Sequence, residues 1–253
     1  MIPLFRTHIY QESIDNVNAV LRSGWLGLGP KTEEFEKAFC GYIGCKYAIA
    51  LNSCTAALQL AVELADLPKS SRVLTTPLTF VATNHVLLQY GLDPIFVDID
   101  PLTGNMSLES IRRLLRLYGR GEHNTTRPRA IMAVHYGGHP IPIDFLYEIG
   151  KEFRLTIIED AAHACGASYL GKKIGADSKF CCFSFHAVKN LAVGDGGMLC
   201  TNDEEIANKA RKLRWFGIDK NSADRSNGGY SWQYGVETLG YKLHMNDIQH
   251  LLA

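Results

Sequence analysis

Side chains that can do chemistry follow several short apolar stretches of the chain. They comprise an amine, a carboxylate, an aromatic ring, an imidazole and hydroxyl groups, at Thr55, Thr79, Phe80, Asp160, His163, Ser184 and Lys189. In an open parallel sheet, ligands bind beyond the carboxyl ends of the strands. If these stretches are strands of one sheet, the side chains that follow them are expected to converge on one site.

Pyridoxal 5'-phosphate (PLP) is a cofactor that needs an amine, an acid, an aromatic ring and hydroxyl donors together. A lysine amine bonds to its aldehyde, and a carboxylate keeps its ring nitrogen protonated. An aromatic side chain stacks on the face of its ring. Lys189, Asp160 and Phe80 are the candidates for these three tasks. Lys189 is also followed closely by the glycine-rich turn at 194–197, where glycine permits a tight reversal of the chain.

A phosphate group needs backbone N–H donors at a helix N-terminus together with hydroxyl groups. Ser53, Cys54 and Thr55 open a predicted helix directly after a strand, so they can supply such a site. Each candidate also has an ordinary explanation: lysines are mostly solvated surface charges, Asp160 could cap a helix, and aromatic rings mostly fill cores. The joint occurrence of all the required groups favours the cofactor site.

The elements that must position these residues alternate between strand and helix. Short apolar runs predict strands at 47–51, 72–76, 94–97, 130–134, 155–158, 180–185 and 198–201. Helix-forming patterns follow at 56–64, 82–89, from Ser107 onward and from Asp203 to Arg214. Several strands are apolar without alternation, as in strands buried on both faces. We therefore predict a three-layer αβα domain with a mostly parallel sheet.

Composition excludes several classes of protein. The 253 residues carry 26 basic and 26 acidic side chains, so no net charge favours binding to nucleic acid or to an anionic membrane. No stretch has the length of a membrane span or the pattern of a signal peptide. The odd number of seven cysteines, without a C-x-x-C motif, indicates reduced thiols in a cytoplasmic protein.

A metal site is not predicted. His135 and His139 have the i, i+4 spacing of helical metal ligands, but Gly137, Gly138 and Pro140 disfavour a helix there. No third ligand accompanies the two histidines.

Several segments together resemble the DegT/DnrJ/StrS family of PLP-dependent sugar aminotransferases, which have the aspartate aminotransferase-type fold. The most specific is Phe-Ser-Phe-His-Ala-Val-Lys-Asn at 183–190, and Glu-Asp-Ala-Ala-His stands at 159–163. The others lie at 23–27, 52–58, 77–83, 97–101, 240–242 and 245–249. The resemblance covers nearly the whole chain and implies that residues 1–253 form a PLP-binding large domain with an N-terminal segment.

The resemblance also implies roles for individual residues. Lys189 would bond to the cofactor and move the proton between cofactor and substrate, Asp160 would bind the pyridine nitrogen, and Phe80 would stack on the ring. His163 stands where many members have glutamine, in contact with the ring oxygen.

The phosphate contacts implied by the resemblance come from two subunits. Ser184 and the backbone at Cys54 and Thr55 would hold the phosphate within one chain. Family members are homodimers, and the loop that contains Lys242 would reach the cofactor phosphate of a neighbouring chain. Many members have asparagine at the position of Lys242.

The implied reaction transfers an amino group, commonly from L-glutamate, to a keto group on a nucleotide-linked sugar. Products of this kind enter cell-surface polysaccharides or secondary metabolites. A related branch has histidine in place of the lysine and removes a hydroxyl group instead, so Lys189 favours transamination. Two alternatives remain: a catalytically silent regulatory or assembly protein of this fold, and a PLP-dependent sugar dehydratase or lyase. Relatives continue into a smaller C-terminal domain, which this chain is expected to lack.

Overall fold

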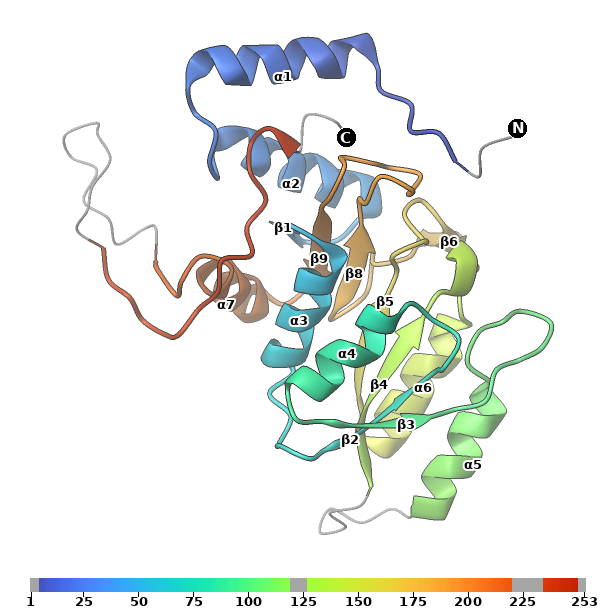
Figure 1. Cartoon of the computed structure of the whole chain (residues 1–253). Coiled ribbons are helices and arrows are strands. Elements are labelled where there is room, and N and C mark those ends of the chain that lie inside the picture. The colour runs from blue at the N-terminus through green and yellow to red at the C-terminus, as the bar shows by residue number, and fades with distance from the viewer. Residues whose placement is uncertain (1–4, 119–126, 220–233, 250–253) are drawn as a thin grey trace.

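The apolar stretches predicted as strands meet in one central sheet (Figure 1). The computed structural model describes residues 5–118, 127–219 and 234–249. Seven strands of this described part lie in the order β1-β9-β8-β5-β4-β2-β3. Their bounds are β1 Tyr47–Leu51, β2 Arg72–Thr75, β3 Asp93–Phe96, β4 Pro128–Val134, β5 Thr156–Asp160, β8 Cys181–Ser184 and β9 Gly197–Thr201.

Most neighbouring strands of this sheet are parallel, as predicted. β3, β2, β4, β5 and β8 pair in parallel, whereas β9 pairs antiparallel with both β8 and β1. β5 extends to Asp160, which was expected just after the strand. The extension arises because the backbone N–H of His135 donates to the carbonyl of Asp160 at 3.0 Å and so continues the ladder between β4 and β5.

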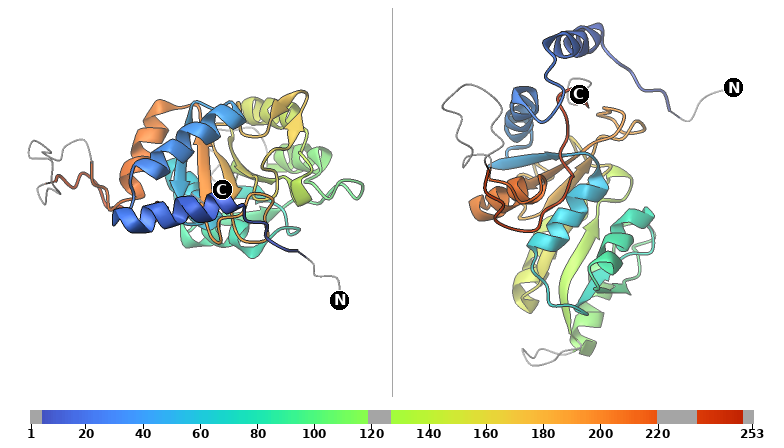
Figure 2. Two further views of the ribbon diagram at one scale, coloured as in Figure 1. Left: turned by 90° about the horizontal axis from the view of Figure 1, so that it is seen from above. Right: turned by 60° about the vertical axis from the view of Figure 1, so that its left-hand side comes forward.

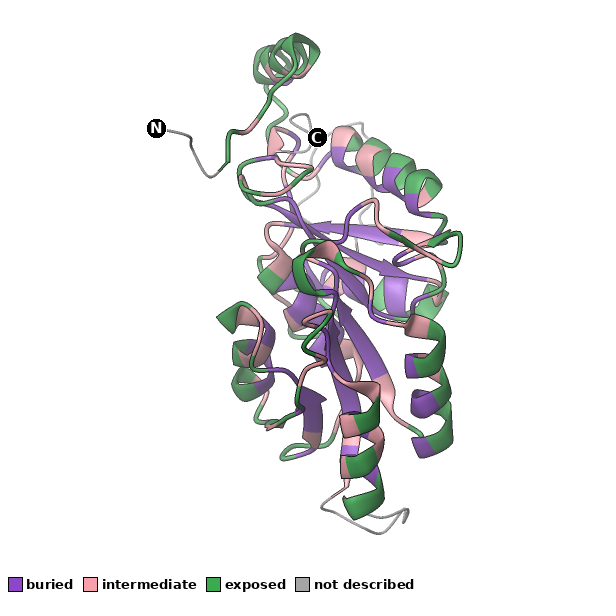
Figure 3. Cartoon of the chain, turned by 90° about the vertical axis from the view of Figure 1, so that its right-hand side faces the viewer, coloured by how far each residue is buried: buried purple, intermediate pink, exposed green. Residues whose placement is uncertain are grey.

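Helices cover both faces of the sheet and confirm the three-layer prediction (Figure 2). Their bounds are α2 Pro30–Ile43, α3 Cys54–Leu64, α4 Val81–Gln89, α5 Leu108–Tyr118, α6 Ile143–Phe153 and α7 Glu204–Leu213. One apolar core joins α3, α4 and α7 to one face of the sheet. On the opposite face, a second core joins α2 to the sheet, and a third core joins α5 and α6 to it. The strands other than the edge strand β3 are buried along most of their length, whereas the helices are buried on their inward sides (Figure 3).

Two smaller features lie outside these layers. Helix α1 (Gln11–Ser23) lies outside the layers of the α/β body (Figures 1 and 2). The segment before it contacts the turn after β8, where the Thr7 hydroxyl donates to the carbonyl of Ala187 at 2.8 Å. Strands β6 (Ser168–Tyr169) and β7 (Lys172–Lys173) form a short hairpin between β5 and β8. In the described ranges, we find no helix with both the length and the apolar character needed to cross a bilayer.

A remote carboxylate caps the N-terminus of α2. Pro30 lacks an N–H group, and Gly29 at the N-cap has no side chain to accept from the first turn. Asp247, buried at 1 % exposure, takes over this task. It accepts hydrogen bonds from the backbone N–H groups of Gly29, Lys31 and Thr32 at 2.9–3.3 Å and from the Thr32 hydroxyl at 2.7 Å. The segment after Lys242 is thereby fixed onto α2.

Replacing Asp247 with alanine is expected to lower the free energy of unfolding by about 2 kcal/mol, because a buried cap with several charged hydrogen bonds is lost. Asp203→Ala is the matched control. Asp203 caps α7 from within its own sequence by accepting from Glu205 and Ile206, and we expect a loss of about 1 kcal/mol. Chemical denaturation of both variants measures the difference, and equal losses would contradict the stronger role of Asp247.

Candidate active site

A cavity of about 690 Å³ opens at the carboxyl ends of β4, β5 and β8. Seven of the eight residues predicted for the site line this cavity: Cys54, Thr55, Phe80, Asp160, His163, Ser184 and Lys189. The eighth, Lys242, is not among its lining residues. The side chains that follow separate strands therefore converge, as expected for ligand sites of open α/β sheets.

Protein donors hold the Asp160 carboxylate in a fixed orientation. The Thr83 hydroxyl donates to Asp160 Oδ2 at 2.7 Å, and the Ala162 N–H donates to Oδ1 at 3.1 Å. Asp160 is 5 % exposed. Each carboxylate oxygen can accept two hydrogen bonds, so both retain capacity for a donor on a ligand in the cavity.

Lys189 lies on the turn that follows β8. Its backbone N–H donates to the carbonyl of His186 at 2.8 Å, which closes this turn. Burial lowers the pKa of the Lys189 amine below its ordinary value of 10.5, and Cys54 and Asp160 partly oppose this shift. Burial and a nearby acid act in opposite senses on the pKa of an amine. The structure shows that burial dominates, so more of the amine is neutral and nucleophilic at a given pH.

The amine of Lys189 is expected to react with acetic anhydride at lower pH than that of Lys209. Burial lowers the pKa of Lys189, whereas the ion pair with Glu205 raises that of the exposed Lys209. Since only the neutral amine reacts, the lower pKa of Lys189 places the midpoint of the pH dependence of its acetylation at a lower pH. Mass spectrometry of acetylated peptides, with each lysine normalised to its own reaction at high pH, provides the comparison. A Lys189 midpoint at or above that of Lys209 would contradict the prediction.

The N-terminus of α3 forms one end of the cavity. Ser53 caps the helix by accepting from the N–H of Ala56 at 3.1 Å, and the N–H groups of a first helical turn have no acceptor within the helix. β9 passes very close by: a Cβ atom on Gly197 would lie 2.4 Å from the backbone of Ser53. Glycine is therefore required there. Together with the Ser184 hydroxyl, these groups are suited to binding an anion.

His163 lies on the cavity wall beside a glycine turn. Burial and the positive charge of Lys189 lower the pKa of its imidazole, against a smaller opposing effect of Asp160. Gly138 has φ +86°, and a Cβ atom there would lie 2.5 Å from the carbonyl oxygen of His163. Gly138 therefore permits both the left-handed turn and the close contact that places His163.

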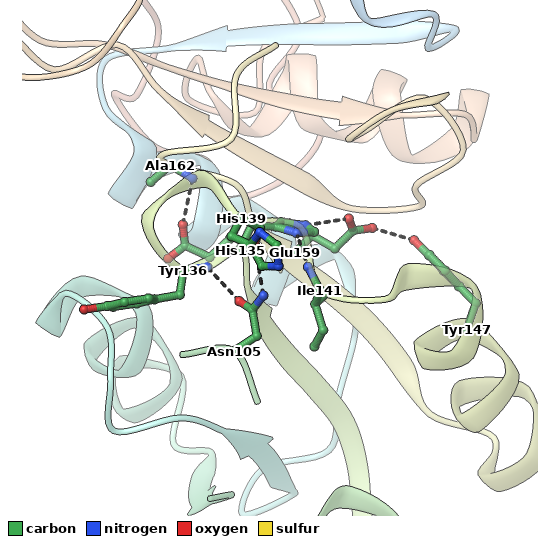
Figure 4. A network of polar contacts seen from close by, with 9 residues as sticks. Asn105, His135, Tyr136, His139, Ile141, Tyr147, Glu159 and Ala162 are labelled. Carbon is green, nitrogen blue, oxygen red and sulfur yellow. Dashed lines mark hydrogen bonds and ion pairs between the residues drawn. The ribbon is translucent and has the colours of Figure 1, made fainter. Parts of the chain in front are cut away.

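A buried polar network lies behind this wall (Figure 4). The Ile141 N–H donates to His135 Nδ1 at 3.3 Å, so Nε2 carries the hydrogen and faces Glu159 Oε2 at 3.1 Å. The Tyr147 hydroxyl donates to the other oxygen of Glu159 at 2.6 Å. Burial and Glu159 raise the pKa of Tyr147, which keeps this hydroxyl protonated. Both ring nitrogens of His135 therefore have protein partners, and its i, i+4 spacing from His139 needs no metal ion as an explanation.

Asn105 holds the loop after β4 from the other side (Figure 4). Its Oδ1 accepts from the N–H of Tyr136 at 2.8 Å, and its Nδ2 donates to the carbonyl of His139 at 3.0 Å. The 3₁₀ turn Tyr136–Gly138 is therefore anchored at both ends. Tyr136 and Gly137 line the cavity, so this loop forms a fixed part of its wall.

Phe80 and Lys242 are placed differently from the buried site residues. Phe80 is the N-cap of α4, is 78 % exposed and is one of the residues that line the cavity. It is therefore available to stack on a planar ligand. The Lys242 amine lies 3.7 Å from the centre of the Trp215 ring, a cation–π contact. Its expected contact with a neighbouring chain stays a prediction.

Two further threonines belong to the cavity: Thr79 was a candidate from the sequence without a specific role, and Thr83 was not a candidate. Thr79 and Thr83 both line it, and their hydroxyl oxygens lie 2.7 Å apart. The usable signal was their i, i+4 spacing across the start of a helix, which places two side chains on one face. Thr83 is fully buried, and its bond to Asp160 spans 77 positions of the sequence.

Known proteins of similar sequence and structure share this architecture. The chain is 40 % identical over 245 residues to the spore coat polysaccharide biosynthesis protein SpsC of Bacillus subtilis, covering 97 % of this chain and 61 % of SpsC. The sugar aminotransferase CalS13 from Micromonospora echinospora superimposes with a TM-score of 0.84 at 35 % identity, over 100 % of this chain and 66 % of CalS13.

A further solved structure is the PLP form of Spr1654 from Streptococcus pneumoniae. It superimposes with a TM-score of 0.85 at 28 % identity, covering 99 % of this chain and 64 % of Spr1654. The chain thus spans less than two thirds of the length of each of these proteins. Residues 7–253 match the DegT/DnrJ/EryC1/StrS aminotransferase family, and the chain belongs to that family.

Proposed function

We propose that this chain is the PLP-binding part of an aminotransferase that transfers an amino group from L-glutamate to a keto group of a nucleotide-linked sugar. The observation that carries the proposal is the convergence of the Lys189 amine, the Asp160 carboxylate and the N-terminus of α3 on one cavity. These are the groups needed to bind an aldehyde, a pyridine nitrogen and a phosphate.

The donor set of the cavity fits PLP. Asp160 has unused acceptor capacity for a ring N–H, since each of its oxygens has one protein donor. The backbone around Cys54 and Thr55, with Ser184, would hold the phosphate, and the exposed ring of Phe80 would stack on the pyridine. When bound, PLP supplies an aldehyde that takes up amines and a ring that accepts electrons.

The chain's own residues would perform binding, orientation and proton transfer. Lys189 Nζ would bind the aldehyde carbon and, when released, carry a proton to or from the reacting carbon, a task favoured by its lowered pKa. His163 would offer a ring N–H to the ring oxygen from its position on the wall. The loop anchored by Asn105 and His135 would hold that wall in place.

The comparisons support the class of substrate. CalS13 is described as a sugar aminotransferase, and SpsC is named for polysaccharide biosynthesis. We therefore place the product among amino sugars for cell-surface polysaccharide or for secondary metabolites. All seven cysteines are free thiols in the structure, which supports a cytoplasmic location because thiols stay reduced there.

The test is an assay of the chain with PLP, L-glutamate and a panel of nucleotide-linked keto sugars. We expect 2-oxoglutarate and an amino sugar to form in equal amounts. Loss of a sugar hydroxyl without consumption of glutamate would indicate the dehydratase alternative. Bound cofactor without any product would indicate the catalytically silent alternative.

We propose a homodimer as the active assembly. Large apolar side chains of the N-terminal segment, of α1 and of the loop after it are exposed, among them Ile9, Tyr10, Leu21 and Trp25, which supports a partner on this side. If Lys242 serves the neighbour's phosphate site, Lys189→Ala and Lys242→Ala damage different sites of a mixed dimer. Mixing the two variants is then expected to restore activity that each lacks alone. No recovery in a mixture shown to contain mixed dimers would exclude this role of Lys242.

A further inference from the structure

Asp160 depends on a residue of α4 for its orientation. The Thr83 hydroxyl reaches Asp160 Oδ2 at 2.7 Å, and Thr83 itself is fully buried. The other donor to this carboxylate, the Ala162 N–H, belongs to the backbone two residues further along. Thr83 is thus the side chain that fixes the second oxygen of Asp160 and, with it, the plane of the carboxylate.

The hydroxyl chain has a defined direction. A carboxylate only accepts hydrogen bonds, so Thr83 must donate its single hydrogen to Asp160. The oxygen of Thr83 is then left as the acceptor for the Thr79 hydroxyl, 2.7 Å away. Thr79 lines the cavity and is partly exposed. The chain therefore runs from Thr79 through Thr83 to Asp160 without a water molecule.

We propose that Thr83 is a positioning residue that aims Asp160 at the ring nitrogen of the cofactor. This inference rests on the proposed function. Two donors on separate oxygens restrict rotation of a carboxylate, and hydrogen bonds to charged groups are the stronger ones. Without Thr83, the carboxylate keeps one donor and can turn away from the ring. The interaction between Asp160 and the ring nitrogen then weakens although Asp160 itself is unchanged.

The test compares cofactor binding by three forms of the 253-residue chain. Thr83→Val replaces the hydroxyl by a methyl group of similar size, and Thr83→Ser keeps the hydroxyl and loses a methyl group. We expect the dissociation constant for PLP to rise about tenfold in Thr83→Val and to change less than about threefold in Thr83→Ser. Fluorescence titration with PLP measures these constants independently of turnover.

A cofactor analogue separates positioning from a structural effect. In 1-deazapyridoxal 5'-phosphate, a carbon replaces the ring nitrogen, so the analogue cannot use Asp160 in the same way. If Thr83 acts through Asp160, wild type and Thr83→Val bind this analogue equally. A Thr83→Val variant that binds PLP and the analogue more weakly than wild type, and to the same extent, would overturn the inference. A variant that binds PLP as tightly as wild type would overturn it as well. If Thr83→Val does not fold, Thr83→Cys, with its weak S–H donor, replaces it under the same expectations.

The wild-type titration distinguishes a failure of the proposed function from a failure of the role proposed for Thr83. A wild-type chain that binds neither PLP nor the analogue would overturn the proposed function and this inference together. A wild-type chain that binds PLP, with a Thr83→Val variant that matches it for both ligands, would overturn the inference alone.

Discussion

Replacing Lys189 with alanine is expected to reduce transamination on the order of 10³-fold or more, because the variant loses both the nucleophile and the proton carrier. The structure gives this amine a lowered pKa and a place beside Asp160 in one cavity. We also expect the visible absorption band that PLP gains on bonding to a lysine to be absent from the variant. Absorption spectra and initial rates measure the two effects.

A matched variant controls for the loss of a lysine as such. Lys172 lies on the β6–β7 hairpin, is highly exposed and pairs with Asp177 at the surface. Lys172→Ala is expected to keep the band and the rate of the wild type. A Lys189→Ala chain with the wild-type band would count heavily against the assignment.

Replacing Glu36 with alanine is expected to lower the free energy of unfolding by about 3–5 kcal/mol, since it leaves the buried guanidinium of Arg214 without its partner. β1 is the last strand at its end of the sheet in the described part of the chain. Glu36 accepts from the N–H of Ala50 at 2.9 Å, and Arg214 donates to the carbonyl of Ala50 at 3.0 Å. Glu36 and Arg214 also form an ion pair, so the pair satisfies both backbone groups of Ala50 at this edge.

The expected loss corresponds to a decrease in melting temperature of roughly 6–20 °C for a chain of this size. Glu205→Ala breaks the exposed pair with Lys209 and is expected to cost less than about 1 kcal/mol. The double variant Glu36→Met with Arg214→Met removes both charges and should be more stable than Glu36→Ala. Calorimetry measures the melting temperatures of these variants. Similar values for Glu36→Ala and Glu205→Ala would exclude the predicted role of the buried pair.

The layers of the fold were predictable because they depend on local patterns. Buried strands such as 130–134 are continuous apolar runs, and the helix after Ser53 has both a cap and strong helix formers. The convergence of Asp160, Ser184 and Lys189 followed from one rule, that ligand sites lie beyond the carboxyl ends of the strands. Seven predicted residues therefore line one cavity.

The contacts that hold the site were not predictable, because they join distant positions. Asp247 caps a helix that begins 217 positions earlier in the sequence, at Pro30, and Thr83 reaches Asp160 across 77 positions. No local pattern shows which distant group each of these residues contacts. The partners of His135, the N–H of Ile141 and the carboxylate of Glu159, were likewise not evident from the sequence.

The most direct measurement of the central claim is to locate the bond between cofactor and chain. The wild-type chain is incubated with PLP, reduced with sodium borohydride, digested and analysed by mass spectrometry. We expect one phosphopyridoxyl group on the peptide that contains Lys189, and none on the exposed Lys172 at limiting PLP. A modification spread over surface lysines, or concentrated on a lysine outside the cavity, would contradict the account.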